Sequence, residues 1–143
     1  MANAVGADGV HLGQEDGSIA DARRILGPSA LIGRSTHSLE QALQAQAEGA
    51  SYIGFGPIFP TPTKPAYGSI GLSHIAEVAA NTTIPVVCIG GIEAGNAGQV
   101  IQAGGSCIAV VRAVCAAADP EAATRALKRT MRNLLPTART SAL

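Results

Sequence analysis

The chain has 143 residues, with ten acidic and ten basic side chains, 47% hydrophobic residues and 3% aromatic residues. This length predicts one domain with a real core, while the balanced charge and scarce aromatics argue against a nucleic-acid surface. The longest apolar stretch, residues 107–118, contains Arg112 and is too short to span a bilayer, and residues 1–4 show no secretory signal. Three cysteines in apolar runs predict buried, reduced thiols, so we expect a cytoplasmic protein with neither membrane nor nucleic-acid partners.

Short apolar runs recur along the chain. Their near-continuous apolar character is typical of strands buried on both faces of a parallel sheet. Five such strands are expected, at residues 9–12, 30–32, 52–55, 85–89 and 107–111.

Helix patterns lie between these strands. Ser38 and Gln41 have the spacing of a capping box, and an alanine-rich helix is expected to follow as far as Gly49. Residues 119–121 combine a capping Asp, a proline at the first helical position and an acid near the positive end of the helix dipole. A short amphipathic helix is expected around residues 97–103. The alternation of strand and helix predicts a parallel α/β fold.

A weak internal repeat relates residues 4–10, 47–53 and 102–108. In the second and third copies, the end of a helix is followed by a glycine and then by a strand. No helix pattern precedes the first copy, so we expect the chain to open at the last turn of a helix that it does not contain.

Residues 56–65, which follow the third strand, form the most distinctive loop. Four prolines stiffen it, and it carries Thr61, Thr63 and Lys64. Proline lowers the entropic cost of holding neighbouring groups in place, and hydroxyls beside an ammonium suit a phosphate. From the loop alone, a proline-rich turn with an exposed lysine is an equally good interpretation.

Together with residues 9–16, 32–38 and 85–92, this loop resembles thiamine phosphate synthase, and the resemblance extends over residues 4–130. That family folds as a (βα)8 TIM barrel, and it joins hydroxymethylpyrimidine diphosphate to thiazole phosphate, releasing pyrophosphate with the help of Mg²⁺. The resemblance implies an incomplete barrel of about five βα units that match strands 4 to 8. Residues 1–135 would form this part of the barrel and residues 136–143 a flexible tail.

The resemblance also implies roles for single residues on the pyrimidine side of the site. Asp16 matches the second of two magnesium carboxylates, although an Asp that caps the helix starting near Ser18 is the alternative. Ser35 and Lys64 match catalytic residues that hold the pyrimidine diphosphate. Lys64 would stabilise charge on the departing pyrophosphate.

On the thiazole side, Thr61 and Thr63 match hydroxyls that face the thiazole phosphate. Gly91 matches a glycine whose backbone lets that phosphate approach near the start of a helix. Val111 and Arg112 match the last phosphate-contacting pair. Arg112 stands where the family commonly has serine, so it either grips the phosphate or extends along the barrel rim to solvent.

Family features expected before the fourth strand, a cluster of diphosphate-binding cations and the other magnesium carboxylate, have no match in this sequence. Two lost donors at ~3 kcal/mol each would cost roughly four decades in rate, so we expect the chain to be nearly inactive alone. Five strands leave open sheet edges, which favour self-association.

Two alternatives remain open. A related thiazole tautomerase has a histidine that His37 resembles, where it would act as acid or base. A non-catalytic phosphate-binding module is the other alternative. His11 and His74 receive no role, because the strand parity of His11 cannot be fixed from the sequence.

Overall fold

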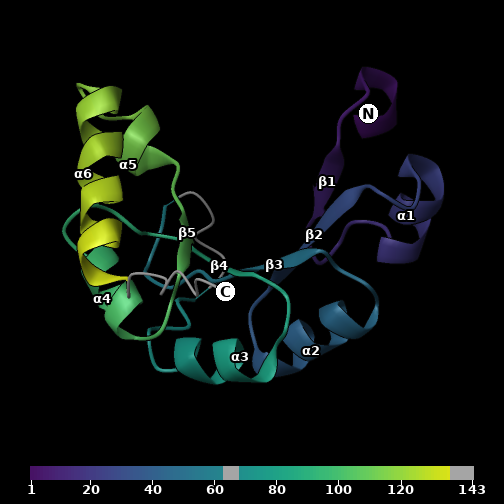
Figure 1. The fold of residues 1–143 in the computed structure, drawn as a ribbon, viewed down its shortest axis with the longest axis horizontal. Helices are drawn as coiled ribbons and strands as arrows, with labels where there is room; N and C mark the ends of the chain where they lie inside the picture. Colours follow the sequence, from purple (N-terminus) through teal and green to yellow (C-terminus); the bar gives the residue numbers. More distant parts are fainter. Residues whose placement is uncertain (63–67, 136–143) are drawn as a thin grey trace, which may run out of the picture.

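In the computed structural model, which describes residues 1–62 and 68–135, five parallel strands form one sheet in chain order. The strands are β1 (Gly9–Leu12), β2 (Leu31–Thr36), β3 (Tyr52–Phe55), β4 (Val86–Ile89) and β5 (Cys107–Ala109). The helices are η1 (Ala2–Val5), α1 (Ile19–Leu26), α2 (Leu39–Ala47), α3 (Ile75–Asn81), α4 (Ala97–Gln102), α5 (Arg112–Cys115) and α6 (Pro120–Leu134). Figure 1 shows a curved sheet with the larger helices along its outer side and β1 and β5 at its two edges. The predicted α/β fold with a parallel sheet is therefore confirmed.

The pairing register assigns the side chains of the strands to two faces. Gly33 pairs with both His11 and Tyr52, so these three residues share one face. Ile32 and Ile53 belong to the opposite face, where both are fully buried against the helices. Other members of this core are Ile19, Phe55, Ile75, Val78, Cys88 and Val100. The core thus lies between the sheet and its helices. The other face of the sheet carries polar and small residues near its centre, together with exposed apolar side chains such as Leu31 and Ile89.

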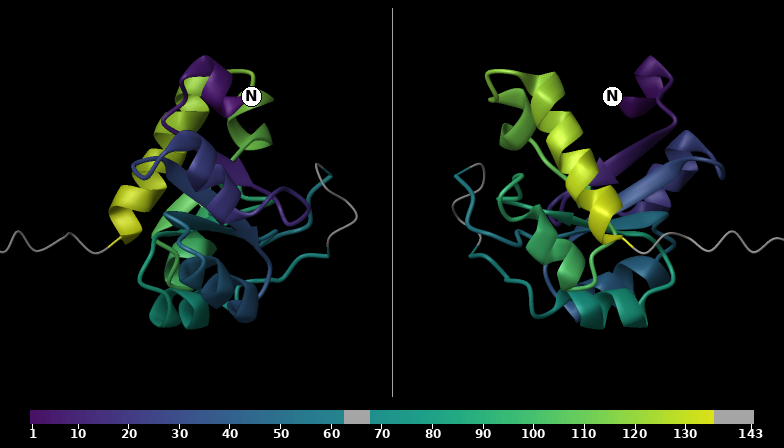
Figure 2. Two further views of the ribbon diagram at one scale, coloured as in Figure 1. Left: turned by 90° about the vertical axis from the view of Figure 1, so that its right-hand side faces the viewer. Right: turned by 60° about the vertical axis from the view of Figure 1, so that its left-hand side comes forward.

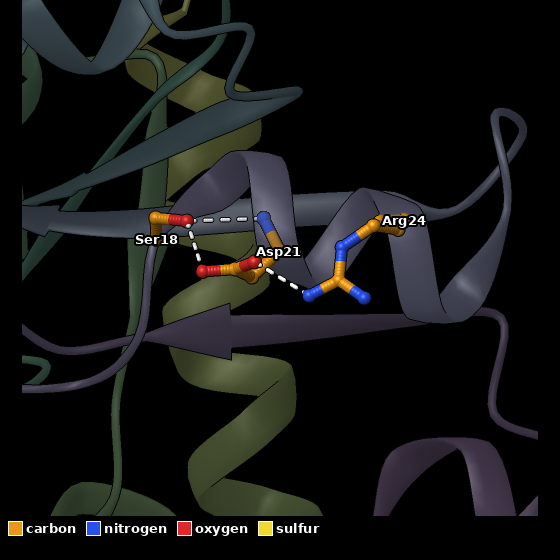
Figure 3. A network of polar contacts seen from close by, with 3 residues as sticks. All are labelled: Ser18, Asp21 and Arg24. Carbon is orange, nitrogen blue, oxygen red and sulfur yellow. Dashed lines mark hydrogen bonds and ion pairs between the residues drawn. The ribbon is translucent and has the colours of Figure 1, made fainter.

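Helix α1 begins at a side-chain cap, which Figure 3 shows from close by. The Asp21 backbone N–H donates to Ser18 Oγ at 3.0 Å, and the Ser18 hydroxyl donates to Asp21 Oδ2 at 2.8 Å. Arg24 donates to the other carboxylate oxygen at 2.7 Å. The hydrogen bond from Arg24, followed by that from Ser18, lowers the pKa of Asp21.

The two predicted helix starts are confirmed. Ser38 Oγ accepts the Gln41 N–H at 3.2 Å, while the Gln41 side chain reaches back to the N–H of His37 at 2.8 Å. Asp119 Oδ1 accepts the N–H of Ala122 at 2.9 Å at the start of α6, in which Pro120 is the first residue. Helix α6 then packs against α4 and α5 beside the β5 edge, as the two views of Figure 2 show.

The repeat corresponds to a shared local structure. Its glycines, Gly6, Gly49 and Gly104, all have positive φ, and each lies between a helix and the next strand. Residues 2–5 form a single 3₁₀ turn that ends at Gly6, which agrees with the expectation of one helical turn before the first strand.

Strands β2 and β5 differ most from their predicted bounds. Strand β2 continues past its apolar run through Arg34, Ser35 and Thr36, because Thr36 is buried with its hydroxyl donating to the Gly54 carbonyl at 3.1 Å. Strand β5 ends at Ala109, and the chain turns at once into α5. Among the described residues, no helix is both long and apolar enough to cross a membrane.

The cysteines are only partly as expected. Cys88 is buried, whereas Cys107 and Cys115 are exposed, and all three are free thiols. Burial, with a smaller contribution from Cys107, raises the pKa of Cys88 to about 11. The Cys88 thiol therefore stays protonated at neutral pH and serves as a core side chain.

Candidate functional site

A pocket of about 720 Å³ lies where the chain leaves strands β2 to β5. The carboxyl ends of parallel strands meet at one edge of a sheet, so the segments that follow them gather there. Predicted site residues from all four of these strands or their following loops line the pocket: Ser35, Thr61, Gly91, Val111 and Arg112. Asp16 is not part of the lining, and Thr63 and Lys64 fall outside the described residues.

The loop after β3 is bound to the end of β4 by backbone hydrogen bonds. The N–H of Ile58 donates to the Ile89 carbonyl at 2.9 Å, and that of Phe59 donates to the Gly90 carbonyl at 3.0 Å. This pairing carries the loop along β4 beyond the end of β3. Thr61 is thereby held at the pocket wall, where it is half-buried.

Gly91 allows the loop and the turn after β4 to come this close. Its φ is +63°, and a Cβ there would lie 2.7 Å from both the Phe59 Cβ and the Pro60 carbonyl oxygen. The resemblance placed Gly91 near the start of a helix. In the structure helix α4 begins only at Ala97, so Gly91 lies in a loop instead. The contribution of this glycine is close backbone approach.

Asn96 secures the turn that contains Gly91, a role that the sequence analysis missed. Its Nδ2 donates to the Gly91 carbonyl at 2.9 Å, and its Oδ1 accepts the N–H of Glu93 at 2.8 Å. Both Asn96 and Glu93 line the pocket. The sequence did contain a signal for this role, because Asn96 lies five positions after the glycine pair and directly before a predicted helix. The simplest interpretation of that position, however, is a helix cap.

Val111 and Arg112 line the pocket at the start of α5. Val111 precedes the first residue of α5, which is Arg112, and both are exposed. The predicted strand over residues 107–111 is therefore too long, because the last two of these residues belong to the turn into α5. Arg112 brings a fixed positive charge to the pocket, which Glu93 also lines.

Ser35 lies on β2 with its hydroxyl 3.0 Å from Nε2 of His11. The Ser35 carbonyl also accepts a hydrogen bond from the Gln14 side chain. His37, on the same pocket edge, has its Nδ1 hydrogen-bonded to the Gly56 carbonyl. The polar groups of the β2 end are therefore fixed by neighbours on three other segments.

Asp16 closes the turn after β1. Its Oδ2 accepts the Gly13 N–H at 2.6 Å, and its own N–H donates to the Gly13 carbonyl at 3.2 Å. Ser18 caps α1, so the alternative role of Asp16 as that cap is wrong. In the described part of the chain, no group of three or more His, Cys, Asp or Glu residues could hold a metal ion. The exposed Asp16 carboxylate suits Mg²⁺ that takes its other oxygens from phosphates and water.

Comparison with known proteins identifies the family of this chain. The family model for thiamine monophosphate synthase matches residues 1–114. The thiamine-phosphate synthase of Methylococcus capsulatus is 50% identical over 128 residues, which are 89% of this chain and 57% of that protein. The corresponding protein of Chloroflexus aurantiacus is 51% identical over 129 residues, which are 90% of this chain and 59% of that protein.

Solved structures show the same relationship. Thiamine phosphate pyrophosphorylase from Pyrococcus furiosus superimposes with a TM-score of 0.85 at 43% identity, over 94% of this chain and 64% of that one. A 3-hexulose-6-phosphate synthase, at 20% identity and a TM-score of 0.65, shares the fold alone. The chain thus spans less than two thirds of the length of these relatives. It belongs to the thiamine monophosphate synthase family.

Proposed function

We propose that this chain forms the thiazole phosphate half of a thiamine-phosphate synthase active site, together with part of the pyrimidine diphosphate half. The reaction is a transfer in which the pyrimidine is joined to thiazole phosphate and pyrophosphate leaves. One observation carries the proposal: Thr61, Gly91, Val111 and Arg112, matched individually to phosphate contacts of the family, surround a single pocket. Its five βα units would then correspond to strands 4 to 8 of a (βα)8 barrel.

The pocket groups provide what a phosphate monoester needs. Thr61 and Arg112 both line the pocket, and a threonine hydroxyl can donate one hydrogen bond to a phosphate while an arginine guanidinium can donate two. The turn at Gly91 lines the same pocket, so its backbone is a further candidate contact for the phosphate. Holding the thiazole by its phosphate would fix its ring relative to the second substrate, which lowers the entropic part of the barrier.

On the diphosphate side, Ser35 would hold the pyrimidine substrate, and Lys64 would face the leaving pyrophosphate. Negative charge grows on that group as it departs, and a preorganised cation or hydroxyl stabilises it most where water is excluded. Mg²⁺, held by Asp16 and by phosphate oxygens, would neutralise part of the same charge. Small-molecule substrates are therefore the expected partners, and self-association through the sheet edges remains a prediction.

A tautomerase-like activity is the second candidate, because His37 lines the pocket with its Nδ1 bonded to the Gly56 carbonyl. A donor at Nδ1 leaves Nε2 as the basic nitrogen of a neutral imidazole. A His37→Gln variant would abolish tautomerase turnover and leave phosphate binding intact.

Calorimetric titration with thiazole phosphate tests the leading proposal. We expect saturable binding by the parent chain and roughly ten- to hundredfold weaker binding by Arg112→Gln, because a charged hydrogen bond is worth about 1.5–3 kcal/mol. Arg24→Gln, a matched loss of one exposed arginine on α1, should bind like the parent. Absence of binding by the parent, or equal affinity in Arg112→Gln, would contradict the proposal. Mg²⁺-dependent binding of the pyrimidine diphosphate separates a synthase site from a simple phosphate-binding module.

A further inference from the structure

Three neighbouring strands bring a histidine, a serine and a tyrosine together on the open face of the sheet. His11 lies on β1, Ser35 on β2 and Tyr52 on β3. Nε2 of His11 is 3.0 Å from Ser35 Oγ, and Nδ1 is 3.1 Å from the Tyr52 hydroxyl. The imidazole therefore connects the two hydroxyl groups, one at each of its nitrogens.

Two glycines make room for this arrangement. A Cβ at residue 33 would lie 2.2 Å from Cζ of Tyr52 and 2.5 Å from Nδ1 of His11, so any side chain there would displace these two rings. A Cβ at residue 54 would lie 3.2 Å from Cε1 of His11, which is also tight. The His11 ring thus lies over Gly33 and Gly54, two residues without side chains. The register between three strands fixes its position.

His11 does not line the pocket, whereas Ser35 does. The described contact through which His11 can act on a ligand there is its hydrogen bond with Ser35. A neutral imidazole has one N–H donor and one acceptor nitrogen, so its two hydrogen bonds must run in one direction. With the Tyr52 hydroxyl donating to Nδ1, Nε2–H donates to Ser35 Oγ, and the Ser35 hydrogen is free to be donated to a ligand. In the reverse direction, Ser35 donates to His11 and can only accept from a ligand.

We propose that His11 is a positioning residue for Ser35, and that Tyr52 selects the tautomer in which Ser35 donates into the pocket. The phenol is a more acidic donor than the serine hydroxyl, which favours this direction. The ligand atom that benefits is an acceptor, such as a diphosphate oxygen or a pyrimidine nitrogen. The inference deepens the proposed function and rests on it for the identity of this ligand, but the tautomer can be measured without a ligand.

The first experiment measures the His11 tautomer in the unliganded chain by long-range ¹H–¹⁵N correlation, at a pH where the imidazole is neutral. We expect the Nε2–H form in the parent and a shift toward Nδ1–H in Tyr52→Phe, which removes only the donating hydroxyl. The signal of His74, at the start of α3, should not change and serves as an internal control. A parent in the Nδ1–H form, or a Tyr52→Phe variant identical to the parent, would overturn the inference.

The second experiment titrates each variant with hydroxymethylpyrimidine diphosphate and, separately, with thiazole phosphate. We expect Ser35→Ala and His11→Ala each to bind the diphosphate about tenfold more weakly, with no further loss in the double variant. His11→Gln should recover part of the affinity, because its amide N–H can replace Nε2–H. Unchanged thiazole phosphate binding in all variants would exclude general damage to the fold.

The two experiments separate the possible failures. A parent chain that binds neither ligand contradicts the proposed function, and the tautomer measurement then still decides the arrangement of His11, Ser35 and Tyr52. A parent that binds the diphosphate, with His11→Ala binding equally well, contradicts the positioning role alone.

Discussion

Gly91→Ala tests whether close contact between two backbone segments builds the pocket. The added Cβ would stand 2.7 Å from the Phe59 Cβ and the Pro60 carbonyl oxygen and 2.9 Å from the Phe59 carbonyl oxygen. Two of these three atoms are backbone, so relief requires the whole loop after β3 to move. Overpacking of this kind costs about 1–3 kcal/mol, and the positive φ adds about 1–2 kcal/mol for any residue other than glycine.

Two other glycines provide matched controls, because they separate the backbone cost from the steric cost. Gly6 has a φ of +64°, almost the same as the +63° of Gly91, and a Cβ there meets no atom within 4 Å. Gly49, between α2 and β3, has a φ of +89° and equally open surroundings. Gly6→Ala and Gly49→Ala should therefore each lose only the backbone cost of about 1–2 kcal/mol.

Urea unfolding at equilibrium, analysed by linear extrapolation, gives the free energy of unfolding of each variant. We expect Gly91→Ala to lose about 1–3 kcal/mol more than either control, and to bind thiazole phosphate about tenfold more weakly as Thr61 is displaced with its loop. Equal losses in all three variants, with unchanged binding in Gly91→Ala, would refute the contact as the basis of the pocket.

Further predictions concern a thiol, a carboxylate and an amide. The two exposed cysteines should react with a thiol reagent in the folded chain at pH 8, and Cys88 only after unfolding, since burial raises its pKa to about 11. Asp21 has a lowered pKa, so its contribution to stability is present above the unfolded value of 3.8 and is lost as the pH falls through the folded value. The free energies of unfolding of Asp21→Asn and of the parent should therefore differ at pH 7 and become equal well below pH 4. A difference that does not change with pH would contradict this. Asn96→Ala loses both hydrogen bonds of the Gly91 turn, so we expect about 1–2 kcal/mol lower stability and weaker phosphate binding.

Local patterns in the sequence predicted the elements and their order. The five apolar runs became the five described strands, and Ser38 and Asp119 cap the helices that they were expected to cap. These features depend on neighbouring residues only, because a cap bonds to backbone groups within one turn. The apolar runs predicted the ends of the strands less well. Strand β2 continues through three polar residues, because each of them is hydrogen-bonded to a neighbouring strand or loop.

The sequence by itself therefore determined the fold class, the family and the convergence of the phosphate-binding candidates, because motifs and carboxyl strand ends are properties of the chain order. Only the tertiary structure decided that His11 contacts Ser35 and Tyr52 and that Asn96 holds the Gly91 turn. It also decided that Ser18, and not Asp16, caps α1. In near-continuous apolar strands the face of each side chain has no signature in the pattern. That face follows from the register between strands, which contacts between distant residues fix.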